Sequence, residues 1–166
     1  MNYKNSLDVP ENTQAQTAIL AGWEGDDLQS FVSRGNSPSA PESTGSGDWR
    51  RYSVNHAIGF AALAELVNLG LPPRSIRNLS PSIDFAVQAG NDSAWLIIRR
   101  NPKPGSGALA TIGEVGWIGD DEFKASGVSD SKLALAISEA GSGSIVLHWK
   151  DIRDRVLVRA AAMASE

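Results

Sequence analysis

The residues from position 49 to position 79 constrain the fold of this chain more than any other stretch. From Val54 to Leu69, apolar residues recur at spacings of three and four, which predicts a helix with most of its circumference buried. Ser53 precedes this run and is a good N-cap. Gly70 tolerates the positive φ of a helix end, and Pro72-Pro73 prevents continuation. The sequence therefore predicts a long core helix with defined ends.

Basic residues flank this helix on both sides. Arg50 and Arg51 come before it together with Tyr52, for which we expect a core position. After it, a short helix is predicted over residues 74–79, with Arg74 and Arg77 three apart and so on one face. The formal charge is −5 for residues 1–48, +4 for residues 49–104 and −3 for residues 105–166. The positive excess thus lies where phosphate contacts would be wanted.

Two further helices are predicted upstream. The first begins at Asn12 or Thr13, with Thr13 as N-cap, and Gly22 ends it; we expect its inward positions to be Ala15, Ala18, Ile19 and Ala21. After Trp23, an apolar anchor, a second helix spans DDLQSFVSR, with Leu28, Phe31 and Val32 inward and Gly35 at its end. Helix, tight glycine-containing turn and helix is the pattern of a helix-turn-helix.

Taken together, residues 12–82 resemble the MerR-type winged helix-turn-helix. The resemblance rests on Arg-Arg-Tyr-Ser at 50–53, the apolar helix, Leu-Gly-Leu-Pro-Pro at 69–73 and the short helix after these prolines. It implies a regulator that binds double-stranded DNA as a dimer on an inverted repeat. The second helix would enter the major groove, and the Ser/Gly/Pro-rich residues 36–48 would form the wing. The implied DNA contacts are Asp26, Asp27, Gln29, Ser30, Ser33, Arg34, Arg50, Arg51, Arg74 and Arg77.

Other interpretations of these residues remain open. Two aspartates at the start of a recognition helix repel phosphate, although a carboxylate can accept from cytosine N4. A degenerate helix-turn-helix that binds a protein, or a plain helical hairpin, fits the same pattern. The size and compact wing also resemble phage and mobile-element regulators and excisionases. An excisionase bends DNA and organises a recombinase instead of switching a promoter.

From Gly90 onward the pattern changes from helical to β. AWLIIRR predicts a strand, ALATIGEVGWI is expected to pair back with it, and GSGSIVLHW predicts another strand. A helix over DSKLALAISEA is expected to be capped by Ser129, with Leu133, Ala134, Ile137 and Ala140 inward. A last helix over residues 150–164 carries Ile152, Val156, Ala160 and Met163 on one stripe. These four are our candidate dimerisation residues, although the stripe could instead dock on the small sheet.

The expected organisation is α+β: a tail over 1–11, the winged helix-turn-helix over 12–82, and a small α+β domain over 83–166 for dimerisation or partner binding. We expect no catalytic residues, cofactor or metal site, because no nucleotide-binding, metalloprotease or thiolate pattern is present. His56 and His148 are expected to be structural. The absence of cysteine, of a long apolar run and of a leader pattern predicts a cytoplasmic chain without a membrane segment.

Overall fold

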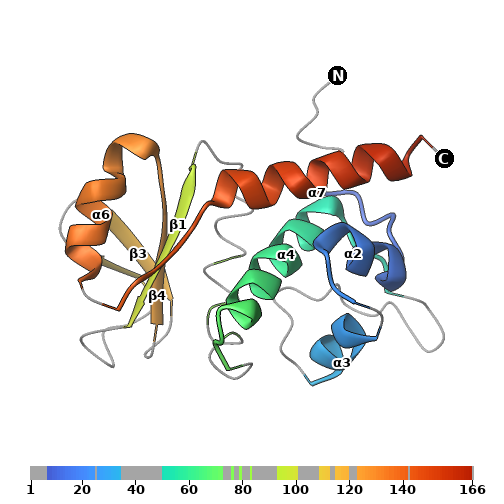
Figure 1. Ribbon diagram of the computed structural model, residues 1–166, viewed down its shortest axis with the longest axis horizontal. Coiled ribbons are helices and arrows are strands. Elements are labelled where there is room, and N and C mark those ends of the chain that lie inside the picture. The colour runs from blue at the N-terminus through green and yellow to red at the C-terminus, as the bar shows by residue number, and fades with distance from the viewer. Residues whose placement is uncertain are drawn as a thin grey trace.

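The computed structural model describes residues 7–24, 26–34, 50–72, 76, 79, 83, 93–100, 109–112, 115–119, 123–141 and 143–165. These residues form an α+β fold in which a helical part and an antiparallel sheet lie side by side, with one long helix running along the helical part from the edge of the sheet (Figure 1). The predicted α+β class is confirmed.

The helical part begins with α2 (Gln14–Ala21), α3 (Asp27–Ser33) and α4 (Val54–Asn68). Thr13 and Ser53 are the N-caps of α2 and α4, as predicted, and each forms a reciprocal capping box with the residue three positions later. Gly22 and Gly70 adopt the positive φ expected at the ends of these helices. Local interactions therefore set where both helices start and stop.

The inward face of α2 differs from the prediction. Ala15 is exposed and Ile19 is 61% exposed, whereas Thr17 is fully buried beside Ala18 and Leu20. Thr17 can be buried because its hydroxyl donates to the Thr13 carbonyl at 2.8 Å, which satisfies the polar atom inside the helix. The predicted inward positions did not include Thr17.

The sheet contains β1 (Trp95–Arg100), β2 (Leu109–Ile112), β3 (Val115–Gly119), β4 (Phe123–Val128) and β5 (Ile145–Leu147). Its order is β2-β3-β4-β1-β5, and every neighbouring pair is antiparallel. The expectation that 109–118 pairs with β1 was wrong, because β2 and β3 form a hairpin and β4 lies between β3 and β1. The sequence of β4, FKASGV, has few of the β-branched and aromatic residues that mark a strand.

One face of the sheet is covered by a short 3₁₀ turn, η1 (Asp130–Lys132), and by α6 (Leu133–Ala140). The small core there joins Ile97, Val128 and Ala136, with Leu133 and Ala140 packed against it. Two of the expected inward positions were wrong: Ala134 is exposed and Ile137 is 41% exposed. Because α6 also carries apolar residues that are exposed, Leu135 and Ile137, apolarity alone does not specify which of its positions meet the sheet.

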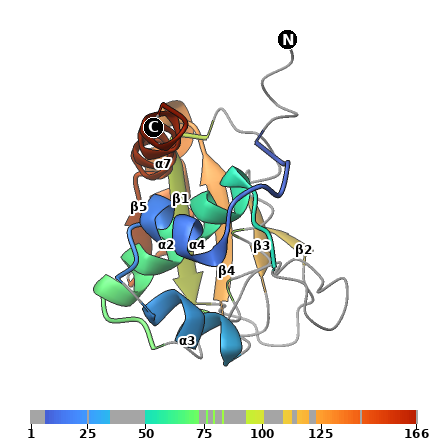
Figure 2. The same cartoon turned by 90° about the vertical axis from the view of Figure 1, so that its right-hand side faces the viewer.

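The last helix, α7 (Trp149–Met163), packs along α4 and α2, and Figure 2 shows it nearly end-on beside them. Ile152 and Val156 are 3% and 0% exposed within the main core, and Ala160 and Met163 pack against that core. Ile152 and Val156 are thus used for packing within the chain, whereas Ala160 and Met163 are only partly buried. The dimerisation role of these four residues stays a prediction.

The main core crosses the predicted domain boundary at residue 82. It joins Leu28 and Phe60 in the helical part to Leu96 and Leu147 in the sheet and to Val156 in α7. The two predicted domains thus share one apolar interior in the described residues. None of the helices described there combines the length and hydrophobicity needed to cross a bilayer.

Candidate nucleic-acid interface

The turn between α2 and α3 is closed by backbone hydrogen bonds. Gly22 has φ 76° and ψ 28°, which places it in the left-handed region. Its amide donates to the Ile19 carbonyl at 3.2 Å, and the Trp23 amide donates to the Ala18 carbonyl at 2.9 Å. These hydrogen bonds satisfy carbonyls that would otherwise lack a donor at the end of α2. The direction in which the chain leaves α2 is therefore fixed.

Trp23 anchors this turn to α4. Its indole Nε1 donates to the Phe60 carbonyl at 2.9 Å, and its ring packs against Phe31 with centroids 5.0 Å apart. Leu28, Phe31 and Val32 form the buried face of α3, as predicted, with exposures of 0%, 6% and 8%. One side of α3 is therefore held by the core, which fixes the side that faces solvent.

The solvent-facing side of α3 carries the side chains expected to read DNA. The exposed residues there and at the two ends of the helix are Asp26, Asp27, Gln29, Ser30, Ser33 and Arg34. The Ser33 hydroxyl donates to the Ser30 carbonyl at 3.0 Å, so it is engaged within the helix. The face thus presents two carboxylates at its start, an amide and a hydroxyl in the middle, and a guanidinium at its end.

The segment leading into α4 is tied back to the segment that precedes α2. Asn12 and Tyr52 form an antiparallel bridge, with the two amide-to-carbonyl distances at 2.8 and 2.9 Å. The Asn12 side-chain amide also donates to the Tyr52 carbonyl at 3.2 Å. This bridge connects the segment after the predicted wing to the segment that precedes α2.

Tyr52 is fully buried beside this bridge, as predicted, with its ring edge-on to Phe60 at a centroid distance of 5.9 Å. Burial raises the pKa of the Tyr52 hydroxyl, and the nearby positive charge of Arg50 opposes this effect. Because Tyr52 points into the core, the residues before it are held at the surface.

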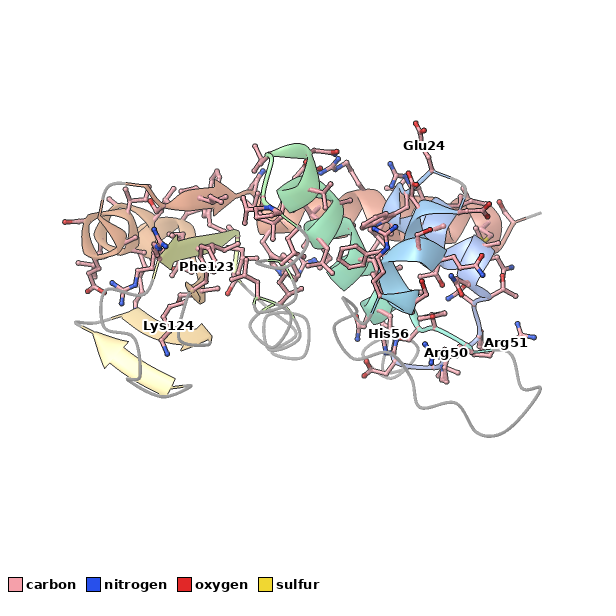
Figure 3. All side chains as sticks on the ribbon, turned by 90° about the horizontal axis from the view of Figure 1, so that it is seen from below. Glu24, Arg50, Arg51, His56, Phe123 and Lys124 are labelled. Carbon is pink, nitrogen blue, oxygen red and sulfur yellow. The ribbon has the colours of Figure 1, made fainter. Side chains whose placement is uncertain are left out.

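Arg50 and Arg51 are both exposed and lie at one edge of the helical part, with His56 beside Arg50 (Figure 3). The Arg51 guanidinium donates to the Glu11 carbonyl at 3.2 Å, which leaves most of its five donors directed elsewhere. His56 has a structural role, since its Nδ1 accepts from the Ser53 amide at 3.0 Å in the capping box.

Sequence reasoning missed two arginines of α7 that contact the helical part. The Arg159 guanidinium donates to the Leu20 carbonyl, at the end of α2, at 3.0 Å. Arg155 pairs with Glu65 of α4 at 2.6 Å and with Asp151 at 3.1 Å. These contacts raise the pKa of Arg155, the hydrogen bond to Glu65 being the larger cause. The only sequence signal was the position of Arg159 on the apolar stripe of its helix.

Two further cations are buried in the sheet, away from α3. Arg99 and Lys124, 4% and 0% exposed, pair across β1 and β4, and Lys124 is labelled in Figure 3. Arg99 donates to the Glu139 carbonyl at 3.0 Å, in the last turn of α6, where the helix dipole favours a cation. Burial lowers the pKa of Arg99, and the Glu139 carboxylate opposes this effect. These contacts are structural.

Several predicted site residues lie outside the part of the chain that is described, namely Arg74, Arg77 and the wing loop 36–48. Of the residues that are described, no group of three or more His, Asp or Glu side chains is placed to hold a metal ion. His148 is exposed, and its ring stacks on that of Trp95 with the two ring centroids 4.4 Å apart.

Comparison with models of protein families finds none that matches the chain, and comparison with curated proteins finds no matching sequence. The proposed function is therefore argued from the residues and their geometry.

Proposed function

We propose that this protein is a sequence-specific regulator of transcription that binds double-stranded DNA through α3. The observation that supports this most directly is the division of α3 into two faces. Leu28, Phe31 and Val32 lock one face into the core, and the opposite face carries Gln29, Ser30 and other polar side chains in solvent.

The dimensions of α3 suit this role. An α-helix with its side chains is about 10–12 Å across, which fits the width of about 12 Å of a B-DNA major groove, and the seven residues of α3 extend roughly 10 Å along it. A helix of this size can lie in the groove and contact a few successive base pairs. Gln29 would pair with adenine N6 and N7, and Asp27 would accept from cytosine N4.

The basic residues at the base of the wing would supply the phosphate contacts. Arg50 and Arg51 are exposed, and the Asn12–Tyr52 bridge ties their segment to the residues that precede α2. In this arrangement they neutralise backbone charge near α3 and offset the repulsion between phosphate and Asp26 or Asp27. The acidic start of α3 would then favour a cytosine-containing site over non-specific binding.

A second candidate, a protein-binding module, is favoured by the same acidic start. Asp26 and Asp27 are exposed, and Arg34 is the basic residue on the described face of α3. Such a surface could dock on a basic partner. The two functions are separated by DNA binding itself, since only the regulator should bind DNA, with a log affinity that falls linearly with log salt concentration.

The test is a titration of the purified protein against fragments of its own upstream DNA, at low and at physiological salt. We expect one fragment to bind at physiological salt. Arg50→Gln or Arg51→Gln should weaken binding to all sequences by about tenfold, since a charge-assisted hydrogen bond contributes roughly 1.5 kcal/mol. Gln29→Ala should change which sequence is preferred.

The matched control is Arg100→Gln, which removes an exposed arginine at the end of β1, outside the helix-turn-helix. It should bind as the unchanged protein does. Equal losses in Arg100→Gln and Arg50→Gln would contradict the proposed interface. Binding of no fragment above the level of random DNA would favour the protein-binding module. Bending of the site and occupation by adjacent copies would identify an excisionase-like factor.

A further inference from the structure

A pocket of about 130 Å³ lies where α7 crosses α2 and α4. Ala61, Ile152 and Val156 contribute apolar atoms to its lining, and Glu65, Arg155 and Arg159 contribute charged groups. The pocket thus combines apolar wall with two guanidinium groups. No residue of α3 lines it, so a ligand site here does not rest on the proposed DNA binding.

The two guanidinium groups are in different electrostatic situations. Arg155 lies between two carboxylates, Glu65 at 2.6 Å and Asp151 at 3.1 Å. Arg159 donates from Nη1 to the neutral carbonyl of Leu20, and it forms no ion pair with any carboxylate in the described residues. The positive charge at this pocket that is still available to an anion is therefore that of Arg159.

Gly22 fixes where this charge sits. A Cβ atom at position 22 would lie 2.9 Å from Nη1 of Arg159, closer than a side chain can normally approach. The guanidinium rests in the space that the missing side chain leaves, and the Leu20 carbonyl holds it at Nη1. The remaining N–H donors of the Arg159 guanidinium are then available to a ligand without a change of rotamer.

We propose that this pocket binds a small carboxylate anion and that Arg159 is the residue that receives the carboxylate. A planar guanidinium matches a carboxylate with two parallel hydrogen bonds, which is stronger than its contact with a neutral carbonyl. An engineered cavity of about 150 Å³ accepts benzene, so this pocket admits an anion of roughly two to four carbons. The alkyl part packs against the apolar part of the lining, where Ala64 is only partly buried.

Titration of the full chain with sodium acetate and sodium butyrate, followed by ¹H–¹⁵N NMR spectra, tests this site. Sodium chloride at the same ionic strength is the reference. The expected result is a saturable shift of the Gly22 amide and of the Arg159 side-chain N–H with millimolar affinity, stronger for butyrate. Shifts equal to those caused by chloride would overturn the proposal.

Two variants that should change the affinity for acetate in opposite directions make the test specific. Arg159→Gln should weaken acetate binding by about tenfold, whereas Lys150→Gln, which removes a cation from the same helix outside the pocket, should leave it unchanged. Glu65→Gln removes a repelling carboxylate and should tighten binding by up to about fivefold. Equal losses in Arg159→Gln and Lys150→Gln, or weaker binding in Glu65→Gln, would refute the assignment to Arg159.

Discussion

The sharpest prediction concerns two valines of α7 that are two positions apart. Val156 is fully buried in the main core, and Val158 is 69% exposed on the same helix. Both lie inside the helix, so a change to alanine alters the intrinsic helix propensity equally, in favour of alanine by up to about 0.7 kcal/mol. The difference between the two variants therefore isolates the contribution of packing.

The magnitude can be worked out from the groups removed. Val156→Ala deletes two buried methyl groups, each contributing about 0.8 kcal/mol, and leaves a small cavity that adds to the loss. We expect the free energy of unfolding to be about 2 kcal/mol lower than that of Val158→Ala. For a chain of this size that corresponds to a difference in Tm of roughly 4–8 °C.

Urea unfolding, followed by tryptophan fluorescence at two protein concentrations tenfold or more apart, measures this difference. Because Val156 packs within its own chain, the loss should be the same at both concentrations. A loss that disappears at high concentration would show that the stripe is an interface between copies. Equal stability of the two variants would refute the placement of Val156 in the core.

Further substitutions test the contacts that hold α2 and α4 in place. Ser53→Ala should lower the free energy of unfolding by about 1 kcal/mol, because the α4 cap is lost. His56→Gln retains a capping-box acceptor and should change the free energy of unfolding much less. Urea unfolding measures both. Gly22→Ala should lower the free energy of unfolding by about 1–2 kcal/mol, because alanine is strained at a φ of 76° and its Cβ would displace Arg159. A decrease below about 0.3 kcal/mol would contradict this. The raised pKa of Tyr52 means that the folded state favours the neutral hydroxyl. The contribution of this neutral form to the free energy of unfolding is fully present below about pH 10 and is lost as the pH rises through the pKa of the folded state. In Tyr52→Phe the free energy of unfolding should therefore decrease less steeply at alkaline pH than in the unchanged protein. The same decrease in both proteins would exclude Tyr52 as its cause.

Features controlled by a few neighbouring residues were predicted correctly. The N-caps Thr13 and Ser53 and the terminating Gly22 and Gly70 act through hydrogen bonds or backbone angles within about one helical turn. The buried triad of α3 was also predicted, because its apolar residues share one side of the helix and the opposite side is polar. The exposure of the candidate DNA-reading residues results from that same pattern.

Features that depend on distant partners could not be obtained in this way. β4 is a strand because β1 and β3 flank it and satisfy its backbone groups, although its own residues favour strand weakly. The orientation of α6 is set by the packing of Ala136 against Ile97 and Val128, which the apolar residues of the helix do not specify because Leu135 and Ile137 are apolar and yet exposed.

By itself, the sequence determined the helix ends, the two-faced character of α3 and the presence of an apolar stripe on the last helix. Only the tertiary structure decided what that stripe covers. Ile152 and Val156 pack within their own chain, and α7 brings Arg159 to the end of α2, a contact between residues 139 positions apart. The physical reason is that an amphipathic helix specifies that a face will be buried but not against what, so its partner is selected by the whole arrangement of surrounding surfaces.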